Sequence, residues 1–248
     1  MGKVQLSPVG SVVGGAVALC VLAVAGQLSV GGAIAGGTYL VVSNALLARG
    51  LRRRGALRFG WANVATAARS TLVGLVAGLV GTAILGGAVS VPLLLGLTIP
   101  ALALDAVDGW LARHTGSASE LGARFDMEVD AFLLLVLSAY VSIGLGPWVL
   151  AIGLMRYAYV AAGWLLPWLN GALPYRYWRK VVTAVQGVAL AAAASGLLTS
   201  WAAAIAVGVA LALLIESFGR DVLWLWVRHR PPRSAIAMNT SVTAKPTR

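Results

Sequence analysis

The topology of the chain follows from residues 91–145, which read VPLLLGLTIPALALDAVDGWLARHTGSASELGARFDMEVDAFLLLVLSAYVSIGL. Two mostly apolar runs, 91–112 and 126–145, flank a short polar turn at 114–121 that is rich in Ser, Thr and Gly. A helix that crosses a bilayer needs about 20 mostly apolar residues, and each run is long enough. The stretch therefore predicts a helical hairpin in a membrane, with its turn at one membrane surface.

The rest of the chain has the same apolar character. Of its 248 residues, 59% are hydrophobic and only 11% are charged, whereas an ordinary soluble domain has about 25% charged residues. The candidate spans, including the two arms of the hairpin, are 10–27, 29–48, 66–87, 91–112, 126–145, 147–168, 181–199 and 201–218. We therefore expect an all-α fold, a polytopic integral membrane bundle of about eight transmembrane helices.

The distribution of basic residues predicts the orientation of this bundle. The chain has 19 Lys and Arg against 8 Asp and Glu, a formal net charge of +11. Most of the bases fall in alternate connections, at 49–58, 113–124 and 176–180, and at the two chain ends, while the other connections carry no charge. Because Lys and Arg accumulate in cytoplasmic loops, we expect both termini in the cytoplasm. The excess of basic residues is then explained by the membrane topology and by contact with anionic lipid. No nucleic-acid partner is expected.

Acidic residues are concentrated in the hairpin, where six of the chain's 8 lie between positions 105 and 130. Asp105 and Asp108 are three residues apart, and Asp126 and Asp130 are four apart, so each pair shares a helix face. The hairpin brings both pairs to one membrane depth. Crowded carboxylates in a medium of low dielectric constant repel one another unless some are protonated or cations neutralise them. Oxygen ligands favour Mg²⁺, with Mn²⁺ as a second candidate.

Two other interpretations of the acidic cluster stay open. In the first, the carboxylates form structural ion pairs with Arg69, Arg113 or Arg124. Acidic residues inside membrane helices are rare and usually functional, which disfavours this interpretation for four residues in two matched pairs. In the second, the cluster is the ion site of a membrane cation transporter or channel. That interpretation leaves Gly109 and Arg113 without a role.

The residues of the hairpin resemble the signature of the CDP-alcohol phosphotransferases. The signature positions stand here at Asp105, Asp108, Gly109, Ala112, Arg113, Gly122, Asp126 and Asp130, all at the family spacing. The stretch Asn63-x-x-Thr66-x-x-Arg69 also looks like the segment that leads into the family's first core helix. The resemblance implies a six-helix core at 60–220. Residues 1–59 then add two helices and a basic loop, and 221–248 form a basic cytoplasmic tail.

The resemblance implies an enzyme of phospholipid synthesis. It would move a phosphatidyl (substituted phosphate) group from a CDP-linked lipid, CDP-diacylglycerol, to an alcohol, and release CMP. Its implied metal ligands are Asp105, Asp108, Asp126 and Asp130, and Asp130 is also the implied general base. The CDP pocket would be lined by Gly109, Ala112, Arg113 and Gly122. We expect this site at the cytoplasmic face of the bilayer, and a homodimer is a candidate assembly.

The acceptor alcohol is indicated only by further basic residues. Arg156 lies well inside an apolar run, where an arginine is seldom without a function. Arg176, Arg179 and Lys180 cluster at the cytoplasmic end of the next run. Together they are candidate ligands for a phosphorylated acceptor such as glycerol 3-phosphate or inositol phosphate. The alternatives are that 176–180 carry only topological charge and that Arg156 forms an ion pair.

Overall fold

The computed structural model describes residues 6–53, 61–114, 120–171, 173–174 and 176–229 of the chain. Within these ranges the side chains of 6–9, 51–53, 61–66, 105–114, 120–121 and 123–124 are not described. All regular secondary structure in the described part is helical. The α-helices are α1 (Leu6–Val24), α2 (Val30–Arg53), α3 (Trp61–Ile84), α4 (Val91–His114), α5 (Glu120–Leu145), α6 (Leu150–Leu165), α7 (Tyr177–Ala194) and α8 (Ser200–His229), and two 3₁₀ helices, η1 (Pro147–Val149) and η2 (Pro167–Asn170), flank α6.

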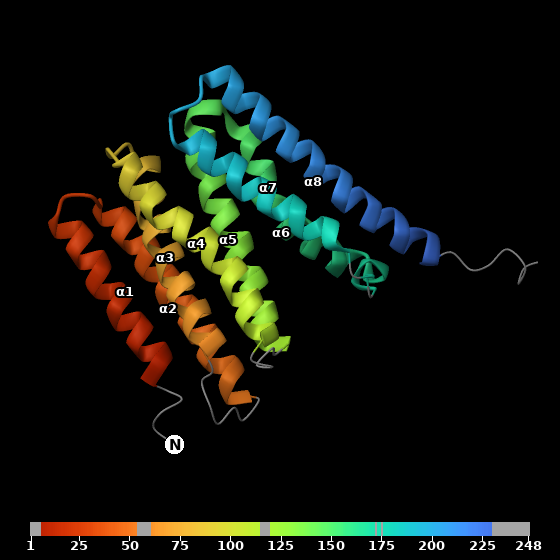
Figure 1. Ribbon diagram of the computed structural model, residues 1–248, viewed down its shortest axis with the longest axis horizontal. Coiled ribbons are helices and arrows are strands. Elements are labelled where there is room, and N and C mark those ends of the chain that lie inside the picture. The colour runs from red at the N-terminus through yellow and green to blue at the C-terminus, as the bar shows by residue number, and fades with distance from the viewer. Residues whose placement is uncertain (1–5, 54–60, 115–119, 172, 175, 230–248) are drawn as a thin grey trace, which may run out of the picture.

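The expected fold class is confirmed: the chain has the features of an all-helical, polytopic membrane protein. Within the described residues, five segments qualify as membrane spans by length and composition, in α2, α3, α5, η1–α6 and α8. Shorter apolar helical segments, Gly10–Val24 and Val91–Leu104, lie in α1 and α4. The predicted hairpin is formed by α4 and α5, which run in opposite directions (Figure 1).

Glycines mark the turns at one end of the bundle. In the described part, positive φ angles occur at Gly26, Gly86, Gly146 and Gly196, which follow α1, α3, α5 and α7. A glycine in this left-handed conformation ends a helix without the steric cost that a Cβ would bring. The ends of α2 and α4 and the starts of α3 and α5 lie at the opposite end of the bundle (Figure 1).

α3 is the central helix of the N-terminal part of the bundle. Residues 73–80 of α3 are all buried, and the helix packs against α1 and α2 as well as against α4 and α5. Val73, Val76 and Leu79 are fully enclosed in the main hydrophobic core. α3 thus places its side chains between the N-terminal pair of helices and the acidic hairpin.

Facing glycines let α2 approach α3 closely. A Cβ added to Gly36 on α2 would lie 2.7 Å from the carbonyl oxygen of Gly74 on α3, and one added to Gly32 would lie 2.4 Å from that of Gly78. Each helix carries its two glycines four residues apart, the small-residue spacing that allows the backbones of membrane helices to touch. The two N-terminal helices are therefore packed into the body of the protein.

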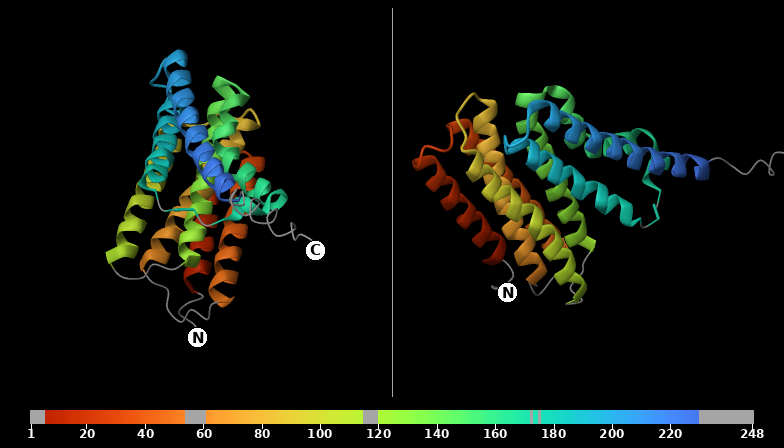
Figure 2. Two further views of the ribbon diagram at one scale, coloured as in Figure 1. Left: turned by 90° about the vertical axis from the view of Figure 1, so that its right-hand side faces the viewer. Right: turned by 45° about the horizontal axis from the view of Figure 1, so that its top comes forward.

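α7 and α8 form a second pair that leans away from the first five helices (Figure 2). The buried side chain of Gln186 joins them, because its Nε2 donates a hydrogen bond of 2.7 Å to the carbonyl oxygen of Ala210. α7 in turn packs against α5 and α4. α8 continues to His229, well beyond the expected end of the last span at 218.

Candidate functional site

An arginine and two aspartates form an ion cluster between α3 and α5. Arg69 on α3 is 0% exposed. Its Nη2 lies 2.7 Å from Oδ1 of Asp126 and 2.8 Å from Oδ1 of Asp130. The same nitrogen lies 3.1 Å from the main-chain carbonyl oxygen of Asp126. One guanidinium nitrogen therefore bridges two carboxylates that are a single helical turn apart, and the two aspartates share a helix face as their spacing predicts.

The cluster is enclosed on the arginine side and partly open on the carboxylate side. The side chains of Asp126 and Asp130 are 27% and 24% exposed, whereas that of Arg69 is 0% exposed. Arg69 pairs with both carboxylates, so the ion-pair interpretation applies to Arg69.

The first half of the signature lies on the last turns of α4. Asp105, Asp108, Gly109, Ala112 and Arg113 have helical backbone, and their side chains lie outside the described ones. These turns of α4 and the first turns of α5 lie toward the same end of the bundle, on helices that both pack against α3 (Figure 1).

The metal site itself stays a prediction. Among the described side chains no group of three His, Cys, Asp or Glu residues is placed to hold a metal ion. The side chains of Asp105 and Asp108 are not among those described. Asp126 and Asp130 offer carboxylate oxygens on one face of α5 at adjoining turns, and such ligands fit Mg²⁺ or Mn²⁺. Gly122, one turn before Asp126, is part of the described structure and is half-buried.

Arg156 is held on a different face of α5. Its Nη2 pairs with Oε1 of Glu128. Glu128 is two residues from both Asp126 and Asp130, which turns its side chain to roughly the opposite side of an α-helix. Arg156 therefore forms an ion pair away from the aspartates, and its position gives no geometric support to a role in acceptor binding.

Arg179 and Arg176 converge on an acidic residue near the end of the chain. Nε of Arg179 lies 2.8 Å from Oδ2 of Asp221, and its Nη2 lies 3.0 Å from Oδ1. Arg176 Nη1 is 4.0 Å from the same carboxylate, and Lys180 is exposed. Sequence reasoning missed Asp221 because it assigned position 221 to the tail. The apolar pattern that continues through 222–227 is the signal that α8 extends past this residue.

A basic and aromatic groove of about 620 Å³ surrounds this ion pair. It is lined by Arg176, Trp178, Arg179, Ser217, Arg220, Asp221, Leu223, Trp224, Val227 and Arg228. The Arg228 guanidinium carbon lies 4.0 Å from the centre of the Trp224 ring, a cation–π contact. The four arginines have two acidic partners, Asp221 and the Glu216 that pairs with Arg220, so the groove keeps a positive balance, which suits an anionic ligand.

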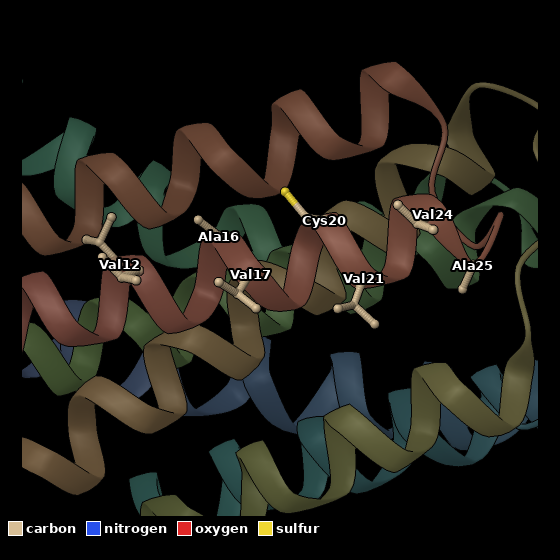
Figure 3. Close-up of a pocket in the computed structure, with 8 residues that line it drawn as sticks. Val12, Ala16, Val17, Cys20, Val21, Val24 and Ala25 are labelled. Carbon is tan, nitrogen blue, oxygen red and sulfur yellow. The ribbon is translucent and has the colours of Figure 1, made fainter.

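A second hollow, on the outer face of α1, has a different character (Figure 3). It measures about 670 Å³ and is lined by Val12, Val13, Ala16, Val17, Cys20, Val21, Val24 and Ala25. These side chains offer no charge and no strong hydrogen-bonding group. Such a surface is typical of a membrane helix that faces lipid, and it is not a candidate site for polar chemistry.

Comparison with known proteins identifies a family for the part of the chain that carries the aspartates. A family model described as CDP-alcohol phosphatidyltransferase matches residues 59–214, more than half of the chain. Comparisons with curated proteins and with solved structures gave no match. The matched segment begins just before α3 and ends within α8, so it includes the Arg69 cluster and excludes α1 and α2.

Proposed function

The chain belongs to the CDP-alcohol phosphatidyltransferase family of phospholipid-synthesis transferases, and we propose that its donor is CDP-diacylglycerol and its acceptor a phosphorylated alcohol. The acceptor hydroxyl oxygen attacks the phosphorus that bears the lipid. The bond between that phosphorus and the CMP oxygen breaks, a phosphodiester forms and CMP leaves. The hydroxyl proton passes to a carboxylate of the protein.

The observation that carries this proposal is the bridge from Arg69 to Asp126 and Asp130. It lies within the family-matched segment, and both aspartates occupy signature positions. The buried guanidinium pairs with both carboxylates and fixes their direction. Asp130, with about a quarter of its side chain exposed, is the candidate general base, since a base must be able to reach the hydroxyl.

We assign the remaining signature residues to the nucleotide and to a divalent cation. Asp105, Asp108, Asp126 and Asp130 would hold Mg²⁺, or Mn²⁺ in its place. When bound, the ion would neutralise pyrophosphate oxygens and the charge that develops on the CMP leaving group. Gly109, Ala112, Arg113 and Gly122 would line the CDP pocket, where the glycines admit the nucleotide close to the backbone.

For the acceptor phosphate we propose the groove between α7 and α8. Asp221 makes two contacts with Arg179 and so fixes the direction of its guanidinium. Arg176 lines the same groove, and Lys180 stands one residue beyond Arg179. Planar guanidinium groups recognise phosphate oxygens through paired hydrogen bonds. Because the charge-rich connections mark one end of the bundle, we place both the aspartates and this groove on the cytoplasmic side.

A panel of acceptors tests the proposal. Purified full-length protein in lipid nanodiscs receives labelled CDP-diacylglycerol, Mg²⁺ and matched alcohols: glycerol 3-phosphate against glycerol, and inositol phosphate against inositol. We expect CMP and a new lipid only with a phosphorylated member. Absence of CMP with every alcohol would contradict the transferase proposal for this donor, and equal turnover of phosphorylated and unphosphorylated forms would contradict the acceptor assignment.

The groove is tested separately by Arg179→Gln. Loss of a charge-assisted contact is worth about 1.5–3 kcal/mol, so we expect the KM for the acceptor to rise about 10- to 150-fold. The KM for CDP-diacylglycerol should change little. An unchanged acceptor KM would remove the groove from the proposal.

A further inference from the structure

The α1–α2 hairpin lies outside the family-matched segment, yet it contacts both helices that carry the Arg69, Asp126 and Asp130 side chains. The ring of Tyr39 on α2 stacks on that of Phe132 on α5, with centroids 4.3 Å apart and planes inclined by 12°. Phe132 is two residues beyond Asp130. The stack therefore joins the added hairpin directly to the helix that carries both described aspartates.

A second contact joins α2 to the helix that carries Arg69. Ser70, the next residue after Arg69, has its Oγ 3.1 Å from Oγ of Ser43 and 3.5 Å from the hydroxyl oxygen of Tyr39. Ser43 and Ser70 are 6% and 2% exposed. A buried hydroxyl group without a partner is costly, so these contacts favour one fixed arrangement of α2 against α3.

The hairpin is itself held firmly at this level. Oγ of Ser11 on α1 donates a hydrogen bond of 2.6 Å to Oδ1 of Asn44 on α2, and Nδ2 of Asn44 donates one of 2.9 Å to the carbonyl oxygen of Leu40. Farther along α2, the facing glycines bring its backbone against α3.

We propose that the α1–α2 hairpin is part of the catalytic apparatus and that Tyr39 is a positioning residue. Through Phe132 and Ser70 it holds α5 and α3 at the separation at which Arg69 bridges Asp126 and Asp130. The inference rests on the proposed function of that aspartate site. A hairpin that only anchored the protein in the membrane would affect stability and leave the site's chemistry unchanged.

Kinetics of the full-length protein separate these two roles. Displacement of catalytic groups by about 1 Å costs up to about 100-fold in rate, so we expect Tyr39→Ala to lower kcat about 10- to 100-fold and to change the KM for CDP-diacylglycerol less than about 3-fold. Tyr39→Phe keeps the stacked ring and should restore kcat to within about 3-fold. The control Val42→Ala, on the exposed face of the same helix, should resemble the unmodified protein. A kcat for Tyr39→Ala within about 3-fold of that protein would overturn the inference.

A stability cycle gives an answer that needs no turnover. Thermal midpoints in detergent are compared for Tyr39→Leu, which keeps an apolar side chain, for Asp130→Asn and for the double variant. If two residues are independent, the decrease in thermal midpoint of the double variant equals the sum of the two single decreases, and if they are coupled it differs from that sum. We expect a difference of at least about 2 °C. A double variant whose decrease equals the sum would overturn the inference. If the unmodified protein releases no CMP, that result refutes the proposed function, while the cycle still decides whether the hairpin and the aspartate site are coupled.

Discussion

Replacement of Arg69 by Gln removes the only charge that this buried side chain brings to Asp126 and Asp130. The substitution keeps much of the volume and some hydrogen-bonding capacity, so it tests the charge more than the packing. We expect the two carboxylates, one turn apart on α5, to repel each other and to leave their present directions. Catalysis should suffer more than binding of the lipid donor, because the acyl chains do not depend on this contact.

The size of the effect follows from the burial of the three groups. Breaking a fully buried ion pair by removing one partner costs about 3–5 kcal/mol. Here Arg69 is fully buried, but Asp126 and Asp130 are 27% and 24% exposed, and solvent reduces the cost to about 2–3 kcal/mol. If that loss falls on the transition state, kcat drops about 30- to 150-fold. Arg69→Lys, which keeps a charge without the planar group, should lie between Gln and the unmodified protein.

The assay is release of labelled CMP by protein in nanodiscs, with the fold checked by circular dichroism and the thermal midpoint. Arg49→Gln, an exposed arginine of α2, is the matched control and should retain normal kcat. A normal kcat for Arg69→Gln, in protein that retains its fold, would refute the reasoning that the bridge organises the site.

Three further predictions concern packing, an ion pair and the cation. Gly36→Ala should lower the thermal midpoint by several degrees, because the added Cβ meets the carbonyl oxygen of Gly74 at 2.7 Å. Gly37→Ala should leave the midpoint unchanged, because its added Cβ meets nothing within 4 Å. Equal midpoints for the two variants would contradict the close packing of α2 on α3. Arg156→Gln should leave the acceptor KM within about 2-fold, since its partner Glu128 is off the aspartate face; a large rise would return Arg156 to the acceptor site. Chelation should abolish CMP release until Mg²⁺ or Mn²⁺ is restored, and full activity in the chelator would contradict the metal assignment.

The hairpin was predictable because its information is local. Apolar runs of helical length predicted α4 and α5. The four-residue spacing of Asp126 and Asp130 predicted that both lie on one face of α5, and Arg69 pairs with both of them there. Arg69 itself entered the prediction only as one of three candidate partners. Which arginine pairs with the aspartates depends on how α3 packs against α5, and periodicity does not encode that packing.

Features that join distant segments were not predictable in the same way. Arg179 and Asp221 are 42 residues apart. The hydropathy pattern predicts that Asp221 is the start of a tail. The helix nevertheless continues, because charged side chains interrupt apolarity without breaking backbone hydrogen bonds. The stack of Tyr39 on Phe132 is likewise a product of tertiary packing.

The ends of α6 show a third limit. The apolar run at 147–168 predicts one helix, but α6 spans Leu150–Leu165 between two 3₁₀ helices that begin at Pro147 and Pro167. Proline lacks the main-chain N–H that an α-helix interior requires, so both residues start a short helix. Hydropathy alone does not register this difference.

The most direct test of the proposed chemistry compares Asp130→Asn with the unmodified protein. Both are supplied with labelled CDP-diacylglycerol, Mg²⁺ and the acceptor found active, and CMP and product lipid are measured together. General-base catalysis contributes about 10²- to 10⁴-fold. We therefore predict that the unmodified protein forms both products in equal amounts and that Asp130→Asn, still folded, is slower by that factor. Turnover by Asp130→Asn near that of the unmodified protein would contradict the account.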